Sequence, residues 1–344
     1  MIRISQLFGK RRGVPTQREI DGDEQFVKMA YRSVLRREVD PDGLRHYTSQ
    51  LQTGALQHAD LLETLMQSGE FRDSYAVADD GQYAAFLSDE TIRCSAELSS
   101  HRTFTIADMD NRVPGFVGVE YYEMHKRRFL EMINALSFIE ERLNRQLKIL
   151  EVGSIFSTKI VRSIFPHSQI STIDILEIEQ IGYGGVFALR DLVDRHYRLD
   201  LAKDDLERTH LEEQGQFEVI LLCEVIEHLL VNPRKVLSFL FRQLKEGGYI
   251  YLTTPNAFKR DNVRLFNRRI MPFPAYPETF SHEDAFMFHI REYGMAELLE
   301  FARSAGGVVS GYHFSDCWDD PEIAGSMAAH ELGNLVVLVQ KPYA

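Results

Sequence analysis

The sequence predicts an α/β protein in which a largely parallel sheet follows a small all-helical unit. Two observations predict the sheet. From Leu147 onward apolar segments of strand length alternate with helical segments, and a glycine and then an acidic residue end the first two strands. One observation predicts the helical unit, because apolar side chains recur at helical spacing within residues 24–75. A chain of 344 residues has room for about two domains.

The composition narrows the class of protein. Apolar residues make up 44% and charged residues 26%, as in globular proteins, and no apolar run approaches the ~20 residues that span a membrane. A net charge of −12 argues against nucleic acid as the main partner, because proteins that bind it usually carry a basic surface. Three scattered cysteines, Cys94, Cys223 and Cys317, indicate a reducing compartment without a disulfide framework or a cysteine zinc site.

The N-terminus predicts a cytoplasmic location. It has no apolar segment followed by a small-residue cleavage site, so it is not a signal peptide. Lys10-Arg11-Arg12 is either a solvated tail or a weak contact for anionic lipid, which would place the protein peripherally at the inner face of the membrane.

After a tail over residues 1–23, the helical unit over 24–75 is predicted to contain three helices. A turn at Asp40-Pro41-Asp42-Gly43 separates the first two, and the third includes Leu61–Met66. The pattern Phe-Val-x-x-x-Tyr-x-x-Val-Leu-x-Arg-x-x-Asp-Pro-x-Gly-Leu, closed by Ser-x-Glu-Phe, resembles a short bacterial helical module that often accompanies surface-polysaccharide and surface-layer proteins. The acidic residues near the turn lack EF-hand spacing, which favours a turn with a helix cap over a calcium loop.

Residues 76–115 are interpreted as a partly ordered linker, because their periodicity is weak. A long amphipathic helix is predicted from about Val119 to Asn144. It opens a second domain over residues 116–344, with a core at 147–342 and an insert at 256–288. The insert is rich in aromatic residues and arginine, so it either builds a substrate pocket or forms a surface flap packed on the sheet.

The first two strands of the core carry the features of a nucleotide site. The first strand runs through Glu151 into a tight turn at Gly153-Ser154, and the second ends at Asp174, 21 positions after Gly153. A glycine lets the backbone approach a ligand, and a carboxylate at the end of the second strand accepts hydrogen bonds from ribose hydroxyls. Asp200 follows the next apolar segment.

A cluster of acidic residues and a histidine follows the apolar strand Phe217–Cys223. The chain continues as Glu-x-x-Glu-His, which places Glu224, Glu227 and His228 at the carboxyl edge of a buried strand, where open α/β sheets bind ligands. If the segment continues as a helix, these residues are at positions i, i+3 and i+4 and share one face. Two carboxylates and an imidazole suit Mg²⁺ or Mn²⁺ better than structural zinc.

The ordered series of motifs over residues 147–342 resembles class I S-adenosylmethionine (SAM) dependent methyltransferases. The resemblance implies a Rossmann-like seven-stranded sheet and SAM as the cofactor. It implies that the cofactor-binding residues are Glu151, Gly153, Ser154, Asp174, Asp200 and Glu224, with Asp200 near the adenine. The first loop departs from the family pattern Glu-x-Gly-x-Gly-x-Gly, because only Gly153 remains. Either the loop moves outward and still binds SAM, or the domain has lost binding; the retained acidic residues favour binding.

Glu-x-x-Glu-His also resembles the metal motif of ubiquinone-type O-methyltransferases and of small-RNA 3′-terminal 2′-O-methyltransferases. The RNA group adds a His-x-x-Glu-aromatic segment, which His289-Ile290-Arg291-Glu292-Tyr293 matches. The resemblance implies catalytic roles for His228, Glu227 and His289, and a Mg²⁺ or Mn²⁺ ion bound by Glu224, Glu227, His228 and His289. A metal-free histidine base and a purely structural role remain open. His282-Glu283-Asp284 is either a rival base cluster or a polar loop.

These features together predict a SAM-dependent O-methyltransferase. The helical module and the fit of a vicinal diol to a metal site point to a sugar hydroxyl of a bacterial cell-surface glycan or its precursor, with glycan-assembly proteins as partners. Two alternatives stay open. One is a methyltransferase for a small phenol or quinone-like acceptor, and the other is a non-catalytic module that uses the helical unit to dock partners.

Overall fold

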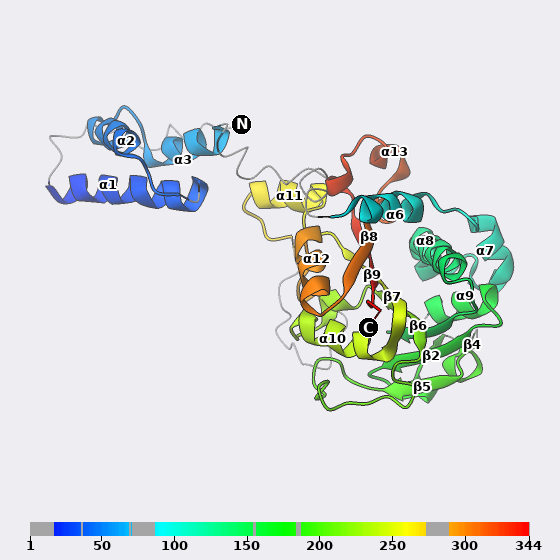
Figure 1. Ribbon diagram of the computed structural model, residues 1–344. Helices are drawn as coiled ribbons and strands as arrows, with labels where there is room; N and C mark the ends of the chain where they lie inside the picture. The colour runs from blue at the N-terminus through cyan, green and yellow to red at the C-terminus, as the bar shows by residue number, and fades with distance from the viewer. Residues whose placement is uncertain are drawn as a thin grey trace. The chain divides into compact units, whose positions relative to one another are not determined.

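The computed structural model describes residues 17–35, 37–68, 70, 87–153, 156–183, 187–272 and 289–343. The chain divides into two compact units, Met1–Asp79 and Asp80–Ala344 (Figure 1). The basic stretch at residues 10–12 lies outside the described residues. Of the helices that the structure describes, none has both the length and the apolar character that a bilayer span requires.

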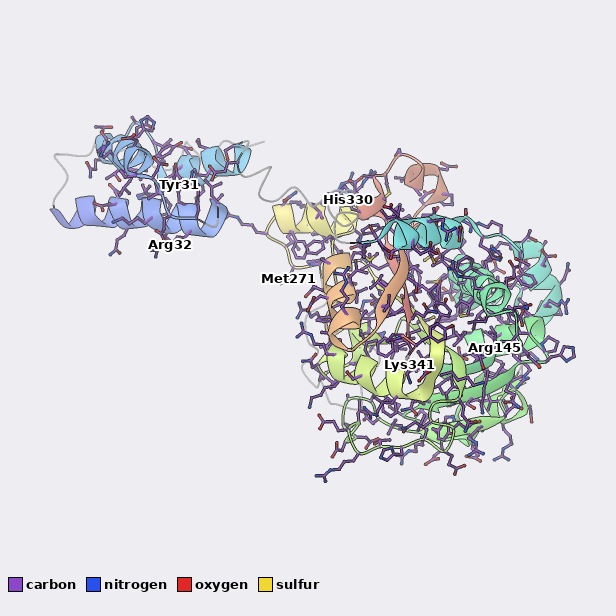
Figure 2. The ribbon with its side chains drawn as sticks, viewed as in Figure 1. Tyr31, Arg32, Arg145, Met271, His330 and Lys341 are labelled. Carbon is purple, nitrogen blue, oxygen red and sulfur yellow. The ribbon has the colours of Figure 1, made fainter. Side chains whose placement is uncertain are left out.

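The N-terminal unit consists of three helices around one small core. Helix α1 (Gln17–Ala30) passes into a π-helical turn, η2 (Tyr31–Leu35), and α2 (Pro41–Thr53) and α3 (His58–Gln67) follow. Tyr31 lies between the helices (Figure 2), and the buried core around it contains Val27, Leu35, Leu51, Leu61 and Leu65. Asp40 caps α2 by accepting a hydrogen bond from the backbone N of Gly43 at 2.8 Å, which confirms the turn-and-cap interpretation.

The second unit is built on a seven-stranded sheet with the strand order β5-β2-β1-β6-β7-β9-β8. All neighbours are parallel except at β9, which is antiparallel to both β7 and β8. The strands are β1 (Lys148–Val152), β2 (Gln169–Asp174), β5 (Arg195–Arg198), β6 (Phe217–Cys223), β7 (Leu244–Pro255), β8 (Val308–Ser315) and β9 (Asn334–Gln340). A two-stranded pair, β3 (Gly182–Tyr183) and β4 (Phe187–Ala188), lies apart from this sheet. The predicted Rossmann-like seven-stranded sheet is therefore confirmed.

Helices cover both faces of the sheet, because its strands carry apolar side chains on both faces, as β7 illustrates. Successive strand residues point to opposite faces, so Tyr249 and Tyr251 belong to one hydrophobic core and Ile250 and Leu252 to the other. The first core is closed by α6 (Asp89–Ser100), α7 (Ile106–Arg112), α8 (Glu120–Leu143) and α9 (Phe156–Ile164). The second core is closed by α10 (Pro233–Gln243) and α12 (Met295–Ser304) (Figure 1). The bounds of α8 agree with the long helix predicted from sequence.

The linker predicted over residues 76–115 is wrong for its second half. Helices α6 and α7 and the short turn η3 (Pro114–Phe116) bury Leu98, Met109 and Phe116 in the same core as α8. Helix α6 also covers the open edge of β8, because Ser95 Oγ accepts a hydrogen bond from the backbone N of Tyr312 at 2.9 Å. These helices are short, and their partner strand lies about two hundred residues away, so local periodicity did not reveal them.

We expect a chain truncated to residues 80–344 to fold on its own, because the N-terminal unit keeps a separate core. A chain that begins at residue 105 should be less stable or aggregate, because it lacks α6 and leaves the β8 edge without hydrogen bonds. Thermal melting followed by circular dichroism, with size-exclusion chromatography, compares the two. Equal melting temperatures and equal monomer fractions would show that α6 contributes nothing to the fold.

Candidate functional site

A pocket of about 430 Å³ opens at the carboxyl edge of the sheet. This volume lies in the range of small-molecule sites. The ends of β1, β2, β6 and β7 form its floor and α8 forms one wall, with side chains that include Tyr121, Arg128, Gly153, Asp174, Asp200, Glu224, His228 and Thr253. The pocket therefore lies at the edge of the sheet at which ligands are expected in this class of fold.

Gly153 is required by the backbone at the end of β1. Its φ is +73°, a left-handed conformation that favours glycine, and a Cβ atom there would lie 2.9 Å from Cγ2 of Val225. Ser154 lies outside the described residues. Phe156, the bulky residue of the altered loop, packs its ring against Phe116 and Tyr121 at centroid distances of 4.9 and 4.8 Å. An aromatic cluster thus holds Phe156 in the pocket wall.

The acidic residues predicted to bind the cofactor divide into two groups. Asp174 and Asp200 line the pocket, and each accepts backbone hydrogen bonds through Oδ1: Asp174 from Leu176 at 3.0 Å, and Asp200 from Ala202 at 2.9 Å. Glu151 does not line the pocket. It is buried behind the loop, where its Oε2 accepts a hydrogen bond from Thr158 Oγ1 at 2.6 Å. Glu151 therefore holds the first turn of α9 in place.

Burial also changes the acidity of this carboxyl. It raises the pKa of Glu151 to about 7, although hydrogen bonds from Ser157 and Thr158 oppose the shift.

Glu224 lines the pocket but is held away from the other residues of its motif. Its φ is +54°, so the chain turns left-handed directly after β6. Its Oε1 accepts hydrogen bonds from Thr253 Oγ1 at 2.7 Å and from Asn334 Nδ2 at 3.1 Å. The carboxylate is thereby fixed on the face of the sheet that α8 covers.

The structure brings together three of the four residues predicted to bind a metal. Single ligand atoms of Glu227, His228 and His289 all lie within 4.8 Å of one another, and the two imidazole rings are 5.0 Å apart. Glu224 is not part of this group, so the predicted four-residue cluster is corrected to three. The predicted continuous helix is also wrong, because Ile226–His228 form a 3₁₀ turn and α10 begins only at Pro233.

Strand β7 explains why the two carboxylates separate. Thr253 and Thr254 are consecutive, so their side chains point to opposite faces of the sheet. Thr253 donates to Glu224, and Thr254 Oγ1 donates to Glu227 Oε2 at 2.9 Å. The two carboxylates of the motif therefore lie on opposite faces of the sheet at its carboxyl edge.

Glu227 is a buried carboxyl with one unused oxygen. Its side chain is fully buried, and among the described residues its Oε1 has no hydrogen-bond partner and lies 3.9 Å from His228 Nε2. Burial, followed by the charge of Glu224, raises the pKa of Glu227 well above the usual range of a glutamate. An unsatisfied buried oxygen beside two imidazoles is the arrangement that a bound cation or proton would stabilise.

His289 is oriented by a second carboxylate. Its Nδ1 lies 3.0 Å from Glu292 Oε1 and must donate to that oxygen, which leaves Nε2 as the acceptor or ligand atom. Glu292 is in turn fixed by Asn262 Nδ2, which donates to its Oε2 at 3.0 Å. The backbone N of Ile290 donates to the carbonyl of Glu227 at 2.7 Å, so the two halves of the cluster are joined through the main chain.

These residues fit a divalent cation. Two atoms that each lie ~2.1 Å from one ion are at most ~4.2 Å apart, so the three ligand atoms, which lie within 4.8 Å of one another, would need only a small adjustment of the side chains to hold one. A carboxylate that accepts from the other ring nitrogen of a ligating histidine is the usual outer-shell partner of such sites, and Glu292 has this place beside His289. The unused Oε1 of Glu227 would supply the third ligand.

Sequence reasoning missed Arg128. This residue of α8 is 8% exposed and lines the pocket, and no carboxylate of the described residues lies within 4.0 Å of it. Its Nη2 lies 3.5 Å from Tyr121 Oη, its Nε is buried without a partner, and its guanidinium lies 5.4 Å from the ring centre of Trp318. The sequence could have revealed Arg128, because it lies one helical turn before Met132 and therefore on the apolar helix face that packs against the sheet.

The rest of the predicted substrate machinery is not part of this pocket. His282, Glu283 and Asp284 lie outside the described residues. None of the described residues of the insert, 256–272, lines the pocket. The insert contributes instead through Asn262, which holds Glu292 and with it His289.

Two family models match parts of the chain. Residues 124–282 match the family described as "Methyltransferase domain". Residues 8–75 match the family described as "Domain of unknown function (DUF4214)". No curated protein matches the chain in sequence.

Solved structures similar to the chain include several methyltransferases at low identity. A Haloferax volcanii methyltransferase in complex with the Trm112 activator has 14% identity and a TM-score of 0.41, covering 71% of this chain and 99% of that chain. Burkholderia thailandensis 1,6-didemethyltoxoflavin-N1-methyltransferase with S-adenosylhomocysteine has 16% identity and a TM-score of 0.41, covering 78% and 92%. N-methyltransferase NodS from Bradyrhizobium japonicum has 12% identity and a TM-score of 0.39, covering 64% and 98%.

We expect Arg128→Met to weaken S-adenosylhomocysteine binding by about 2–3 kcal/mol and to leave 5′-methylthioadenosine binding unchanged. The second ligand lacks the amino-acid end, whose carboxylate is the anion that a buried guanidinium would hold. Asp174→Ala is the matched variant, because we expect Asp174 to contact the ribose that both ligands share, and its loss should weaken both by about 1–3 kcal/mol. Calorimetry measures both affinities, and equal losses for the two ligands in Arg128→Met would contradict the assignment.

We expect Glu151→Gln to remove a pH-dependent loss of stability. The folded-state pKa of Glu151 is raised from 4.5 to about 7, so the folded chain binds more protons than the unfolded chain between these values, and stability falls as pH rises through that window. The shift corresponds to roughly 3 kcal/mol. Urea unfolding at pH 5 and pH 8 should show a smaller decrease for Glu151→Gln than for the parent. The exposed variant Glu246→Gln is the control, and an unchanged pH slope in Glu151→Gln would refute the expectation.

Proposed function

We propose that this chain, which carries a SAM-dependent methyltransferase domain, transfers the methyl group to a sugar hydroxyl of a bacterial cell-surface glycan or its activated precursor. The observation that carries the proposal is the position of His228. It lines the cofactor pocket and also belongs to the cluster with Glu227 and His289. A hydroxyl held at this cluster would lie next to the methyl donor.

The residues that line the pocket suit a nucleoside that carries charged groups, such as SAM. Asp174 would accept hydrogen bonds from the ribose hydroxyls, and Gly153 lets the backbone approach the ligand. Arg128 would hold the carboxylate of the methionyl end, and Glu224 would face its ammonium group. The SAM carboxylate and ammonium would thus meet opposite charges on α8 and at the end of β6.

The chemistry needs an aligned hydroxyl whose proton has an acceptor. The oxygen forms a bond to the methyl carbon while the bond from carbon to sulfur breaks, and sulfur keeps the electron pair. When no ion is bound, the proton of the hydroxyl passes to an imidazole nitrogen of His228, because a nitrogen that binds an ion cannot also accept a proton. The products are a methyl ether and S-adenosylhomocysteine, and the proton then leaves His228 for solvent through the partly exposed side of the cluster.

Glu227, His228 and His289 would hold a Mg²⁺ or Mn²⁺ ion, which supplies a Lewis acid that lowers the pKa of a bound hydroxyl. The chain's own contribution is to fix these side chains. Thr254 and Glu292 each hold one of them, and the 3₁₀ turn sets the distance between Glu227 and His228.

The sugar acceptor rests on two further arguments. A cation beside two imidazoles and a carboxylate suits two neighbouring hydroxyls, as on a sugar ring. The N-terminal helices resemble a module that accompanies surface-polysaccharide proteins, and their separate core allows them to dock glycan-assembly partners without disturbing the catalytic unit. Methyl transfer from radiolabelled SAM to acidic glycan fragments, with catechols in parallel, tests the acceptor class. Transfer to catechols alone would overturn the glycan proposal and leave the methyltransferase intact.

We expect Mn²⁺ to bind the full chain and Glu227→Gln or His289→Ala to weaken that binding at least tenfold, because each variant removes one ligand atom. Affinity should rise with pH, because the raised pKa of Glu227 makes a proton compete with the ion. Calorimetry and the electron paramagnetic resonance of Mn²⁺ measure binding without activity.

His210→Ala, at an exposed histidine outside the cluster, is the control variant for metal binding. S-adenosylhomocysteine affinity should be unchanged in all three variants. If Mn²⁺ does not bind, while His228→Ala abolishes methyl transfer and chelator leaves it intact, a metal-free histidine base replaces the ion.

A further inference from the structure

Residues 258–271, which we call the α11 segment, present an unusually open apolar surface. Helix α11 (Arg260–Asn267) has one buried side chain, Asn262, and nearly every residue after it is exposed. An eight-residue helix that buries so little has little packing of its own to stabilise it. The exposed large apolar side chains of the segment are Phe258 (48%), Val263 (37%), Phe266 (37%), Ile270 (44%) and Met271 (68%).

The charge of the α11 segment is opposite to that of the whole protein. Five cationic residues stand against one acidic residue within these fourteen positions, although the chain carries a net charge of −12. Arg260 pairs with Glu331, and Arg264 pairs with Asp261 within the helix. Arg268 and Arg269 are exposed, and no carboxylate of the described residues lies within 4.0 Å of either.

We propose that the α11 segment docks the enzyme on an anionic lipid surface. Exposed Phe, Val, Ile and Met beside a cluster of arginines is the composition of an interfacial helix, which buries its apolar side in the headgroup region and places its cations at the phosphates. The apolar residues are mostly aliphatic, which suits acyl chains better than the stacked bases of nucleic acid. Figure 1 shows α11 at the margin of the catalytic unit, and Figure 2 shows Met271 at the edge of that unit.

The docking surface connects directly to the candidate catalytic cluster. Asn262, the buried residue of α11, donates to Glu292 at 3.0 Å, and Glu292 orients His289 through a contact of 3.0 Å. Membrane contact would therefore hold the helix that positions His289 and bring the cluster to the bilayer surface. This inference does not depend on the identity of the acceptor, because lipid binding is measured without turnover.

Co-sedimentation of the full chain with vesicles tests the inference. The chain should bind vesicles that contain phosphatidylglycerol far better than vesicles of phosphatidylcholine alone, and added salt should weaken the binding. Arg268→Gln with Arg269→Gln should lower the partition coefficient about 30-fold, at roughly 1 kcal/mol for each charge near the surface. Ile270→Ser with Met271→Ser should lower it about tenfold or more, because two side chains no longer enter the interface.

The control is Arg208→Glu with Ile323→Ser, which changes one cation and one exposed apolar residue elsewhere and should leave partition unchanged. All variants should bind S-adenosylhomocysteine as the parent does, which shows that they are folded. Absence of binding to anionic vesicles would overturn the proposal. So would binding that persists in the α11 variants but is lost when residues 10–12 are removed. A change of oligomeric state in the α11 variants without lipid would also overturn it, because the segment would then be an interface between copies.

Discussion

Two consecutive threonines of β7 bind Glu224 and Glu227 on opposite faces of the sheet, and this separation determines the layout of the site. Strand β7 lies inside the sheet between β6 and β9, and the alternation of its side chains sends Thr253 toward α8 and Thr254 toward the opposite core. Each threonine hydroxyl donates to one carboxylate, so one carboxylate faces the pocket and the other faces the two histidines. A motif of five residues thereby contributes to two neighbouring sites with different tasks.

Most of the fold was predictable, because it depends on local patterns. Buried strands appear as apolar runs, and the 24-residue helix α8 appears as a long amphipathic stretch. The linker prediction fails over α6 and α7, because their apolar residues find partners on α8 and β8 only in the folded chain. Strand alternation and helix spacing are local properties, whereas covering the edge of a sheet is a tertiary one.

The candidate site was predictable in composition but not in geometry. The sequence predicts carboxylates and imidazoles at the ends of β2 and β6 and in the segment after α11, and the structure places Asp174, Asp200, Glu224 and His228 around the pocket and His289 beside His228. The sequence does not reveal that the backbone of Glu224 adopts a left-handed conformation, because a positive φ at a non-glycine residue is imposed by the surrounding structure. Nor does it reveal Arg128, whose burial against the pocket depends on how α8 packs.

Electrostatics shows how the two sites can work together. On the α8 side a buried guanidinium without a carboxylate partner among the described residues stands near Glu224, which suits a zwitterion. On the other side Glu227 is buried with an unused oxygen, which suits a cation or a proton. His228 is the residue of the three-membered cluster that also lines the pocket. Under the proposed function, a methyl group that leaves the cofactor would pass beside this imidazole, and the two sites would cooperate through an acceptor hydroxyl held at His228.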